Sequence, residues 1–305
     1  MIVALLIIFG PVIVRQLAPA EPRSLERVAL KDTTFTEVAF RNAAEDIDLA
    51  GLLFVPAGEG PYPAAVIIHG SGTSRRDNGW YLTLTKFLQE NGVVVLLPDK
   101  RGSEKSGGDW HTASFEDLAT DTLAAIEYLR RQDTVELTTL GVVGMSQGGW
   151  IAPIVATRSA DVGFVVNMVG SAVTPDEQFA YEENLNLRQM GFLPGISNVV
   201  SLLSRAWITN VAQQDFWGAI DGFDPLPYWQ DVEVGTLVLY GGDDTNVPSR
   251  ESAARLYDLR KPNIRVSIYE GSGHALEDPP EYGNSLIRYD ALEAIGQFIQ
   301  ASALD

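Results

Sequence analysis

From residue 34 onward, the chain alternates between short strand-like segments and longer helix-like ones. Residues 34–40 alternate polar and apolar positions with a period of two, and residues 47–55 are a plausible antiparallel partner. Further strand-like segments follow at 64–68, 93–97, 140–144, 162–169, 236–240 and 266–269. Apolar positions at helical spacing fill 80–90, 114–131 and 285–300. This order predicts an α/β fold with a mostly parallel, doubly wound sheet and helices on both faces.

One segment, residues 174–231, interrupts this alternation because it has a helical pattern but no core strand. It is inserted between the strand near Val166 and the strand near Val238. Its aromatic residues are Phe179, Tyr181, Phe192, Trp207, Phe216, Trp217, Phe223 and Trp229. We expect most of them to form the core of the insertion and its contact with the sheet. Two or three are expected to face a partly apolar pocket.

The N-terminus is almost wholly apolar over Met1–Val14. This run is shorter than the roughly 20 residues that span a bilayer, but it suits the core of a signal peptide. We therefore expect residues 1–20 to be a signal peptide or an N-terminal membrane anchor, residues 21–31 a linker, and residues 32–305 the folded domain. The protein would then be exported or periplasmic, and a retained N-terminal segment would associate it with the membrane. A buried N-terminal helix in a cytoplasmic protein is the alternative.

Composition limits the function classes further. A chain of 305 residues with 46% hydrophobic residues can bury one large core. A formal net charge of -18 argues against binding of nucleic acid, because a phosphate backbone would be repelled. The chain has no cysteine and only three histidines, which are not clustered, so we expect no metal site and no cofactor. A small-molecule partner fits these limits best.

The segment Gly144–Gly148, with the sequence GMSQG, directly follows the strand-like residues 140–143 and precedes a helix-like segment. Such a strand–turn–helix arrangement exposes the hydroxyl of Ser146. The flanking glycines are needed because a Cβ there would collide with the adjoining strand and helix. Ser146 is therefore a candidate nucleophile.

An aspartate and a histidine follow in order, each just after a strand. The loop after residues 236–240 carries Asp243 and Asp244, and the loop after residues 266–269 carries His274. In open α/β sheets, functional residues collect at the carboxyl ends of the strands. A serine hydroxyl needs a neighbouring imidazole as general base, and a carboxylate orients that imidazole.

This order of Ser, Asp and His resembles the α/β-hydrolase superfamily, and the resemblance covers about residues 33–299. The loop pattern G-x-x-D-x-x-V-P of that family falls on Asp244, whereas Asp243 reads as a solvated turn residue. The resemblance implies that Ser146 is the nucleophile, His274 the base and acid, and Asp244 the group that orients the imidazole.

The segment His69-Gly70-Ser71-Gly72 follows the strand 64–68 and resembles the H-G-x-G turn of the same superfamily. That resemblance implies an oxyanion hole built from the backbone N–H groups of Ser71 and Gln147. His69 precedes the serine and ends a different strand, so we expect it to brace the turn rather than act as the base.

The segment 98–110 resembles the D-x-R-G-x-G-x-S loop of many α/β-hydrolases, with Glu104 at a position where glycine is usual. We expect Asp99 and Arg101 to hold this loop beneath the active site. The insertion 174–231 corresponds, by the same resemblance, to a helical cap over the active site.

Serine at the nucleophile position distinguishes this chain from haloalkane dehalogenases and epoxide hydrolases, which resemble it in fold but have aspartate there. We therefore expect a carboxylic ester hydrolase that forms an acyl-enzyme with a small or medium acyl ester. A proline iminopeptidase-type peptidase is one alternative, and it would need acidic cap residues such as Glu177, Glu182 and Glu183. Thioesterases, C–C bond hydrolases and a receptor-like ligand-binding protein are the others. The sequence leaves the acyl group, the leaving group and the oligomeric state open.

Overall fold

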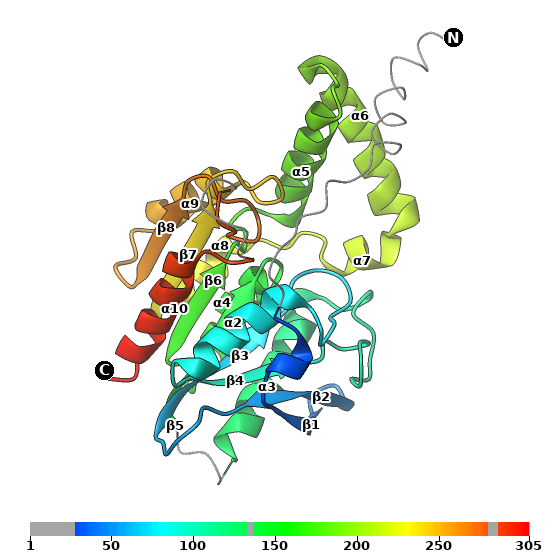
Figure 1. The fold of residues 1–305 in the computed structure, drawn as a ribbon. Coiled ribbons are helices and arrows are strands. Elements are labelled where there is room, and N and C mark those ends of the chain that lie inside the picture. Colours follow the sequence, from blue (N-terminus) through cyan, green and yellow to red (C-terminus); the bar gives the residue numbers. More distant parts are fainter. Residues whose placement is uncertain (1–27, 133–136, 280–285, 305) are drawn as a thin grey trace.

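The computed structural model describes residues 28–132, 137–279 and 286–304, and these contain one eight-stranded sheet (Figure 1). In chain order, the strands are β1 (Thr36–Asn42), β2 (Ile47–Phe54), β3 (Tyr62–Ile68), β4 (Val94–Pro98), β5 (Leu137–Met145), β6 (Phe164–Met168), β7 (Gly235–Gly241) and β8 (Ile264–Tyr269). Their spatial order is β1-β2-β4-β3-β5-β6-β7-β8. The pairs β1–β2 and β2–β4 are antiparallel, and all later pairs are parallel.

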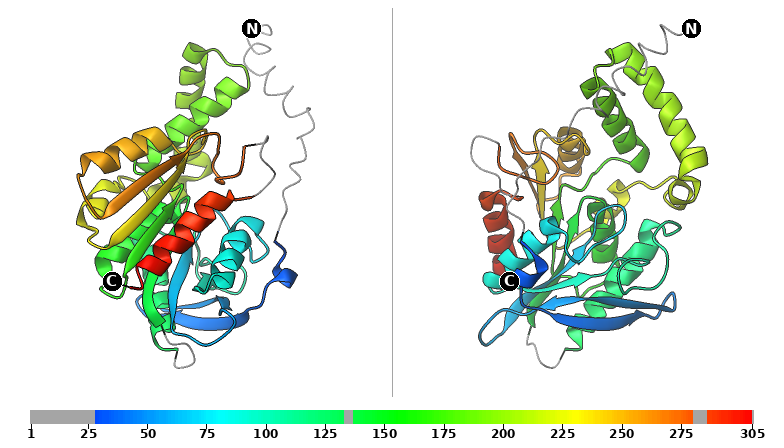
Figure 2. Two further views of the ribbon diagram at one scale, coloured as in Figure 1. Left: turned by 60° about the vertical axis from the view of Figure 1, so that its left-hand side comes forward. Right: turned by 45° about the vertical axis from the view of Figure 1, so that its right-hand side comes forward.

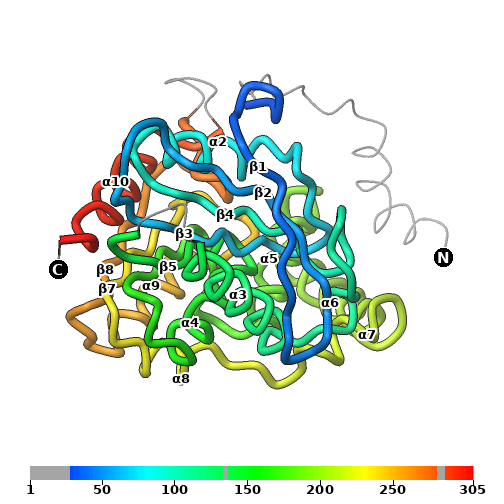
Figure 3. The backbone as a smooth tube through the Cα atoms, turned by 90° about the horizontal axis from the view of Figure 1, so that it is seen from below, coloured from blue at the N-terminus to red at the C-terminus, as the bar shows by residue number. Residues whose placement is uncertain are grey.

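Helices cover both faces of this sheet (Figure 3). They are α2 (Gly79–Glu90), α3 (Phe115–Arg130), α4 (Gly148–Arg158), α9 (Ser249–Asp258) and α10 (Tyr289–Ala301). Alternate residues of each strand face opposite sides, so Val142 packs with α3 and α4, whereas Val143 packs with α2 and α10. The central strands β3 to β7 are largely buried on both faces, whereas the edge strands β1 and β8 are partly exposed. The predicted doubly wound α/β fold is confirmed.

The inserted segment lies between β6 and β7 and contains no strand in its described residues. Its helices are α5 (Pro175–Gln189), α6 (Pro194–Trp207), the π-helical turn η2 (Ile208–Ala212), α7 (Gln214–Ala219) and α8 (Leu226–Asp231). The pair α5 and α6 projects away from the sheet, and α8 returns the chain to it (Figure 2). We call the segment from α5 to α8 the cap.

The predicted final helix begins later than expected, at Tyr289 instead of residue 285. Arg288 is extended, with ψ of 142°, and its backbone N–H donates to the carbonyl of Leu276 at 2.7 Å. This tertiary hydrogen bond holds the backbone of Arg288 outside the helix.

The expected signal peptide or anchor, residues 1–20, lies outside the described residues, as does most of the expected linker. The last residues of that linker enter a short 3-10 helix, η1 (Leu30–Asp32). Across 28–132, 137–279 and 286–304, no helix combines the length and apolar character that a bilayer crossing requires. Export and membrane association remain predictions.

The burial pattern generates a stability prediction. Leu96 in β4 is 0% exposed, and truncation to alanine leaves a cavity between β4 and its packed helices. We expect Leu96→Ala to lower the free energy of unfolding by about 2–5 kcal/mol in urea denaturation. The matched control is Leu203→Ala on α6, where Leu203 is 66% exposed. This variant is expected to change the free energy of unfolding by less than about 0.5 kcal/mol. Equal losses for the two variants would contradict the described core.

Candidate active site

Ser146 lies on the sharp turn between β5 and α4, with a positive φ of 55°. A non-glycine residue adopts this conformation at a cost, so the surroundings must hold it there. A Cβ on Gly144 would clash with the backbone of Gly148, and one on Gly148 would clash with the carbonyl of Ile68. The two glycines therefore allow the close packing that this turn requires, as the sequence pattern predicts.

Three of the predicted site residues lie in one hydrogen-bonded chain. Ser146 Oγ is 2.9 Å from His274 Nε2, and His274 Nδ1 is 2.8 Å from Asp244 Oδ2. When Nδ1 carries the proton, it donates to the carboxylate, and Nε2 is free to accept the serine proton. The side chain of His274 is 25% exposed, so the imidazole can be reached from solvent. This geometry can remove a proton from the serine hydroxyl.

Backbone donors fix the carboxylate of Asp244. Its Oδ1 accepts hydrogen bonds from the N–H groups of Asn246, at 2.8 Å, and Val247, at 2.9 Å. Its Oδ2 is left for His274. Asp244 is 2% exposed, whereas the neighbouring Asp243 is exposed. The structure therefore places Asp244, and not Asp243, against the imidazole.

Two aromatic side chains support the loops that carry this chain of groups. The indole Nε1 of Trp80, on α2, donates to the carbonyl of Ala275 at 3.0 Å, directly after His274. The hydroxyl of Tyr181, on cap helix α5, donates to the carbonyl of Asp244 at 2.8 Å. The cap is thus hydrogen-bonded to the loop of the carboxylate. The sequence assigned Trp80 no role, because an aromatic residue at the start of a helix is usually a packing residue.

The predicted oxyanion turn lies beside the serine. A Cβ on Gly70 would sit 3.2 Å from the Cβ of Ser146 and from the hydroxyl of Tyr81, so a side chain there would require these neighbours to shift. The N–H of Gly70 donates to the hydroxyl of Tyr81 at 2.8 Å, which orients the turn. Ser71 is exposed, whereas Gln147 is buried at the N-terminus of α4, where the helix dipole favours negative charge. The two predicted donors therefore come from segments on either side of the serine.

His69, at the start of the oxyanion turn, is buried against Tyr81. Its Nε2 lies 2.5 Å from the carbonyl oxygen of Pro98, at the end of β4. Burial lowers the pKa of this imidazole to about 4, so it is neutral at physiological pH. These contacts match a bracing role and leave His274 as the imidazole beside the serine.

The loop after β4 is held by buried ion pairs, as expected for Asp99 and Arg101. Both carboxylate oxygens of Asp99 accept from Arg76, at 2.8 and 2.6 Å. Arg101, 4% exposed, binds Glu45 through two donors and Asp121 through its Nε at 2.6 Å. Because the carboxylates of Asp99 and Asp121 face these guanidinium groups, the loop is fixed beneath the site.

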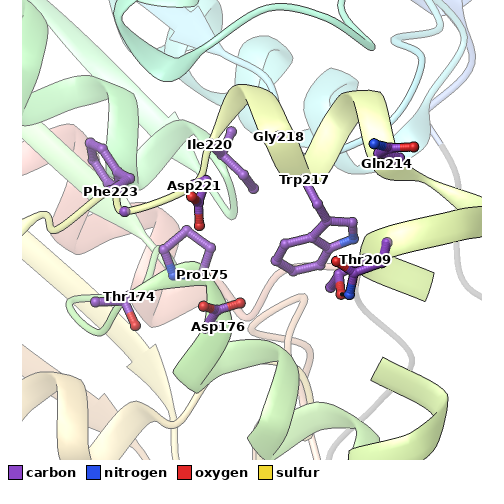
Figure 4. Close-up of a pocket in the computed structure, with 12 residues that line it drawn as sticks. Thr174, Pro175, Asp176, Thr209, Gln214, Trp217, Gly218, Ile220, Asp221 and Phe223 are labelled. Atoms are coloured by element: carbon purple, nitrogen blue, oxygen red, sulfur yellow. Dashed lines mark hydrogen bonds between the residues drawn. The ribbon is translucent and has the colours of Figure 1, made fainter. Parts of the chain in front are cut away.

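A partly open cavity of about 470 Å³ lies at the base of the cap, between the start of α5 and α7 (Figure 4). Trp217 and Phe223 line it, together with Thr174, Asp176 and Thr209. None of the lining residues belongs to the hydrogen-bonded chain of Ser146.

Most of the cap aromatics pack inside the cap or against the sheet domain, as expected. Phe179 stacks on Trp217 with ring centroids 4.8 Å apart, and Phe223 contacts Phe115 of α3 at 4.7 Å. Trp229, on α8, is fully buried in the hydrophobic core. Trp207 differs, because it is 60% exposed on α6.

Comparison with known proteins identifies relatives of this chain. Residues 123–288, more than half of the chain, match the family described as BAAT / Acyl-CoA thioester hydrolase C terminal. Residues 45–195 match the X-Pro dipeptidyl-peptidase (S15 family). Esterase EstD of Thermotoga maritima is 23% identical over 242 residues, which cover 75% of this chain and 58% of that relative. The peroxisomal succinyl-coenzyme A thioesterase of Mus musculus is 23% identical over 242 residues, covering 74% and 52%. The chain therefore spans less than two thirds of the length of either relative.

Solved structures show the same fold. An esterase of Pyrococcus furiosus superposes with a TM-score of 0.67 at 18% identity, covering 92% of this chain and 96% of the other. A hypothetical protein of Pseudomonas aeruginosa superposes with a TM-score of 0.66 at 17% identity, covering 93% and 98%. The α/β-hydrolase resemblance is thereby confirmed, and the chain belongs to the BAAT / acyl-CoA thioester hydrolase C-terminal family.

Proposed function

We propose that this protein is a serine hydrolase that cleaves carboxylic esters through an acyl-enzyme. The observation that carries the proposal is the hydrogen-bonded chain from Ser146 Oγ through His274 to Asp244, with distances of 2.9 and 2.8 Å. Its geometry meets the requirement that a nucleophile and a base lie within hydrogen-bond reach and that a third group orients the base.

The first half of the reaction makes the acyl-enzyme. His274 Nε2 takes the proton of Ser146 as Oγ attacks the carbonyl carbon of the ester. The oxyanion that forms accepts hydrogen bonds from the backbone N–H groups of Ser71 and Gln147. The tetrahedral intermediate then collapses, and His274 gives its proton to the leaving alcohol.

The second half releases the acid. A water molecule attacks the acyl carbon while His274 Nε2 accepts one of its protons. Asp244 stabilises the imidazolium that exists at this point, because its carboxylate faces Nδ1. Collapse of the second tetrahedral intermediate returns the proton to Ser146 Oγ and frees the carboxylic acid.

Thioester cleavage is the second candidate function. It is favoured by the match of residues 123–288 to a thioester hydrolase family and by the similarity to a succinyl-coenzyme A thioesterase. The same steps apply with a thiol as leaving group. The similarity to the Thermotoga maritima and Pyrococcus furiosus esterases supports the ester proposal instead.

Peptidase activity has one specific observation in its favour. Glu182, on cap helix α5, is partly buried, and burial raises the pKa of its carboxyl, which interacts electrostatically with His274 and Asp244. Its Oε1 accepts from the side-chain amide of Asn246 at 3.2 Å. Glu177 is engaged elsewhere, because two hydrogen bonds from Arg255 hold the pKa of its carboxyl at about 2. Of Glu177 and Glu182, Glu182 is therefore the better placed to bind a substrate amine.

Removal of the nucleophile tests the proposal first. Ser146→Ala is expected to lower kcat for p-nitrophenyl butyrate by about 10⁴–10⁶-fold, because no other group supplies the attacking oxygen. Ser302→Ala, at the end of α10, makes the same chemical change away from the site and is expected to keep full activity. The proposal is wrong if Ser146→Ala retains the turnover of the Ser302→Ala control.

The adjacent aspartates provide a matched pair. Asp244→Asn keeps the size of the side chain but favours the wrong imidazole tautomer, and we expect a loss in kcat of about 10⁴-fold. Asp243→Asn changes an exposed residue and is expected to leave kcat unchanged. Steady-state ester hydrolysis measures both, and a larger loss for Asp243→Asn would refute the assignment.

Glu182→Gln separates the ester and peptidase functions. An esterase that acts on neutral acyl groups is expected to lose little activity toward p-nitrophenyl butyrate and to cleave proline naphthylamide poorly before and after the change. If the wild type cleaves proline naphthylamide better than the ester, and Glu182→Gln abolishes only that activity, the peptidase function is the correct one.

A further inference from the structure

Lys100 is a buried lysine at the carboxyl end of β4 that the proposed reaction does not use. It is 8% exposed. Its Nζ donates to the carbonyl oxygen of Gly70 at 2.9 Å and to Oε1 of Gln147 at 2.6 Å. The same Nζ lies 5.2 Å from the ring centroid of Trp110. Removing an ammonium group from water costs free energy, so the burial of Lys100 needs a physical explanation.

Both hydrogen-bond acceptors belong to the segments of the predicted oxyanion hole. The carbonyl of Gly70 and the N–H of Ser71 are the two ends of one peptide group, and in a trans peptide they point in opposite directions. A hydrogen bond at the carbonyl therefore fixes the direction of the Ser71 N–H. The side chain of Gln147 is anchored by the same ammonium, and the backbone N–H of Gln147 is the second predicted donor.

The ammonium also has an electrostatic effect on these two backbone donors. A hydrogen bond to a carbonyl oxygen polarises its peptide and strengthens the N–H at the other end. A positive charge one peptide group away from a developing oxyanion is most effective where water is excluded.

The charged neighbours of Lys100 leave this positive charge unneutralised. The carboxylate of Asp99 faces Arg76, and that of Asp121, on α3, faces Arg101. Among the residues that the structure describes, no carboxylate forms an ion pair with Nζ of Lys100.

The titratable groups beside the oxyanion turn carry no charge at neutral pH. Burial lowers the pKa of His69 to about 4 and raises that of Tyr81 to about 12, so both are neutral. Neither group adds a charge beside the ammonium of Lys100, which donates its two hydrogen bonds to the two oxyanion segments.

We propose that Lys100 is a positioning residue of the oxyanion hole, which orients the Gly70–Ser71 peptide and Gln147 and strengthens both backbone donors through its positive charge. The inference rests on the proposed acyl transfer at Ser146. Lys100 touches no reacting atom and moves no proton. It acts through the two donors, so its loss affects the transition state more than substrate binding.

A charge-dependent role predicts a pH dependence. Burial lowers the pKa of Lys100 to about 7. Because a lysine loses its charge as the pH rises through its pKa, kcat is expected to fall on the alkaline side while KM changes little. A purely structural lysine would produce no such decline.

The test compares Lys100→Met with Lys105→Met in ester hydrolysis. Lys105 lies in the same loop, but its side chain is 60% exposed and pairs with Glu37. Lys100→Met is expected to lower kcat by about 10- to 100-fold, less than the loss of a donor itself, and to remove the alkaline decline. Lys105→Met is expected to match the wild type in both respects.

Chemical rescue separates charge from packing. The chain has no cysteine, so Lys100→Cys carries a single thiol, and aminoethylation of that thiol restores an ammonium at this position. We expect kcat to recover on aminoethylation. An aminoethylated Lys100→Cys protein that is folded, as its circular dichroism shows, and is no more active than the unmodified variant would overturn the proposal.

The outcomes also distinguish this inference from the proposed function. If Ser146→Ala is inactive and Lys100→Met keeps wild-type kcat, the role of Lys100 is wrong and the acyl-enzyme stands. If Ser146→Ala keeps wild-type activity, the proposed function fails, and the inference fails with it.

Discussion

The site depends on one constraint, which is the close approach of backbone segments around Ser146. The residue keeps a φ of 55° because glycines at 144 and 148 allow β5, α4 and the end of β3 to pack without side chains between them. That packing puts the serine hydroxyl at the carboxyl edge of the sheet, beside the turn at Gly70. The loops after β7 and β8 then bring Asp244 and His274 to the same edge. Strand order alone thus assembles residues that are up to 128 positions apart in sequence.

A second layer of contacts makes this arrangement rigid. Tyr181 ties the cap to the loop of Asp244, and Trp80 ties α2 to the loop of His274. The buried ammonium of Lys100 links Gly70, in the predicted oxyanion turn, to the side chain of Gln147. Catalytic groups are effective only when their own positions are held by such neighbours. In the proposed mechanism, the buried ammonium of Lys100 serves the function of the site as well as its stability.

Much of the fold and of the site was predictable, because the relevant signals are local in sequence. Apolar runs marked the strands, and the GMSQG segment marked the turn at Ser146 by a requirement that only glycine meets. The start of α10 was not predictable from such signals, because a hydrogen bond from Arg288 to Leu276 determines it. Lys100 was missed for a similar reason. A lysine in a polar loop reads as solvated, and only the three-dimensional neighbourhood shows that it is buried.

The most direct test of the account is to map the site of covalent attack by a fluorophosphonate. Such a reagent reacts with an activated serine and leaves a stable adduct on its oxygen. Intact-mass measurement followed by peptide mapping is expected to find one adduct per chain, located on Ser146, and none in Ser146→Ala. An adduct on another residue, or equal labelling of the Ser146→Ala variant, would contradict the claim that Ser146 is the nucleophile.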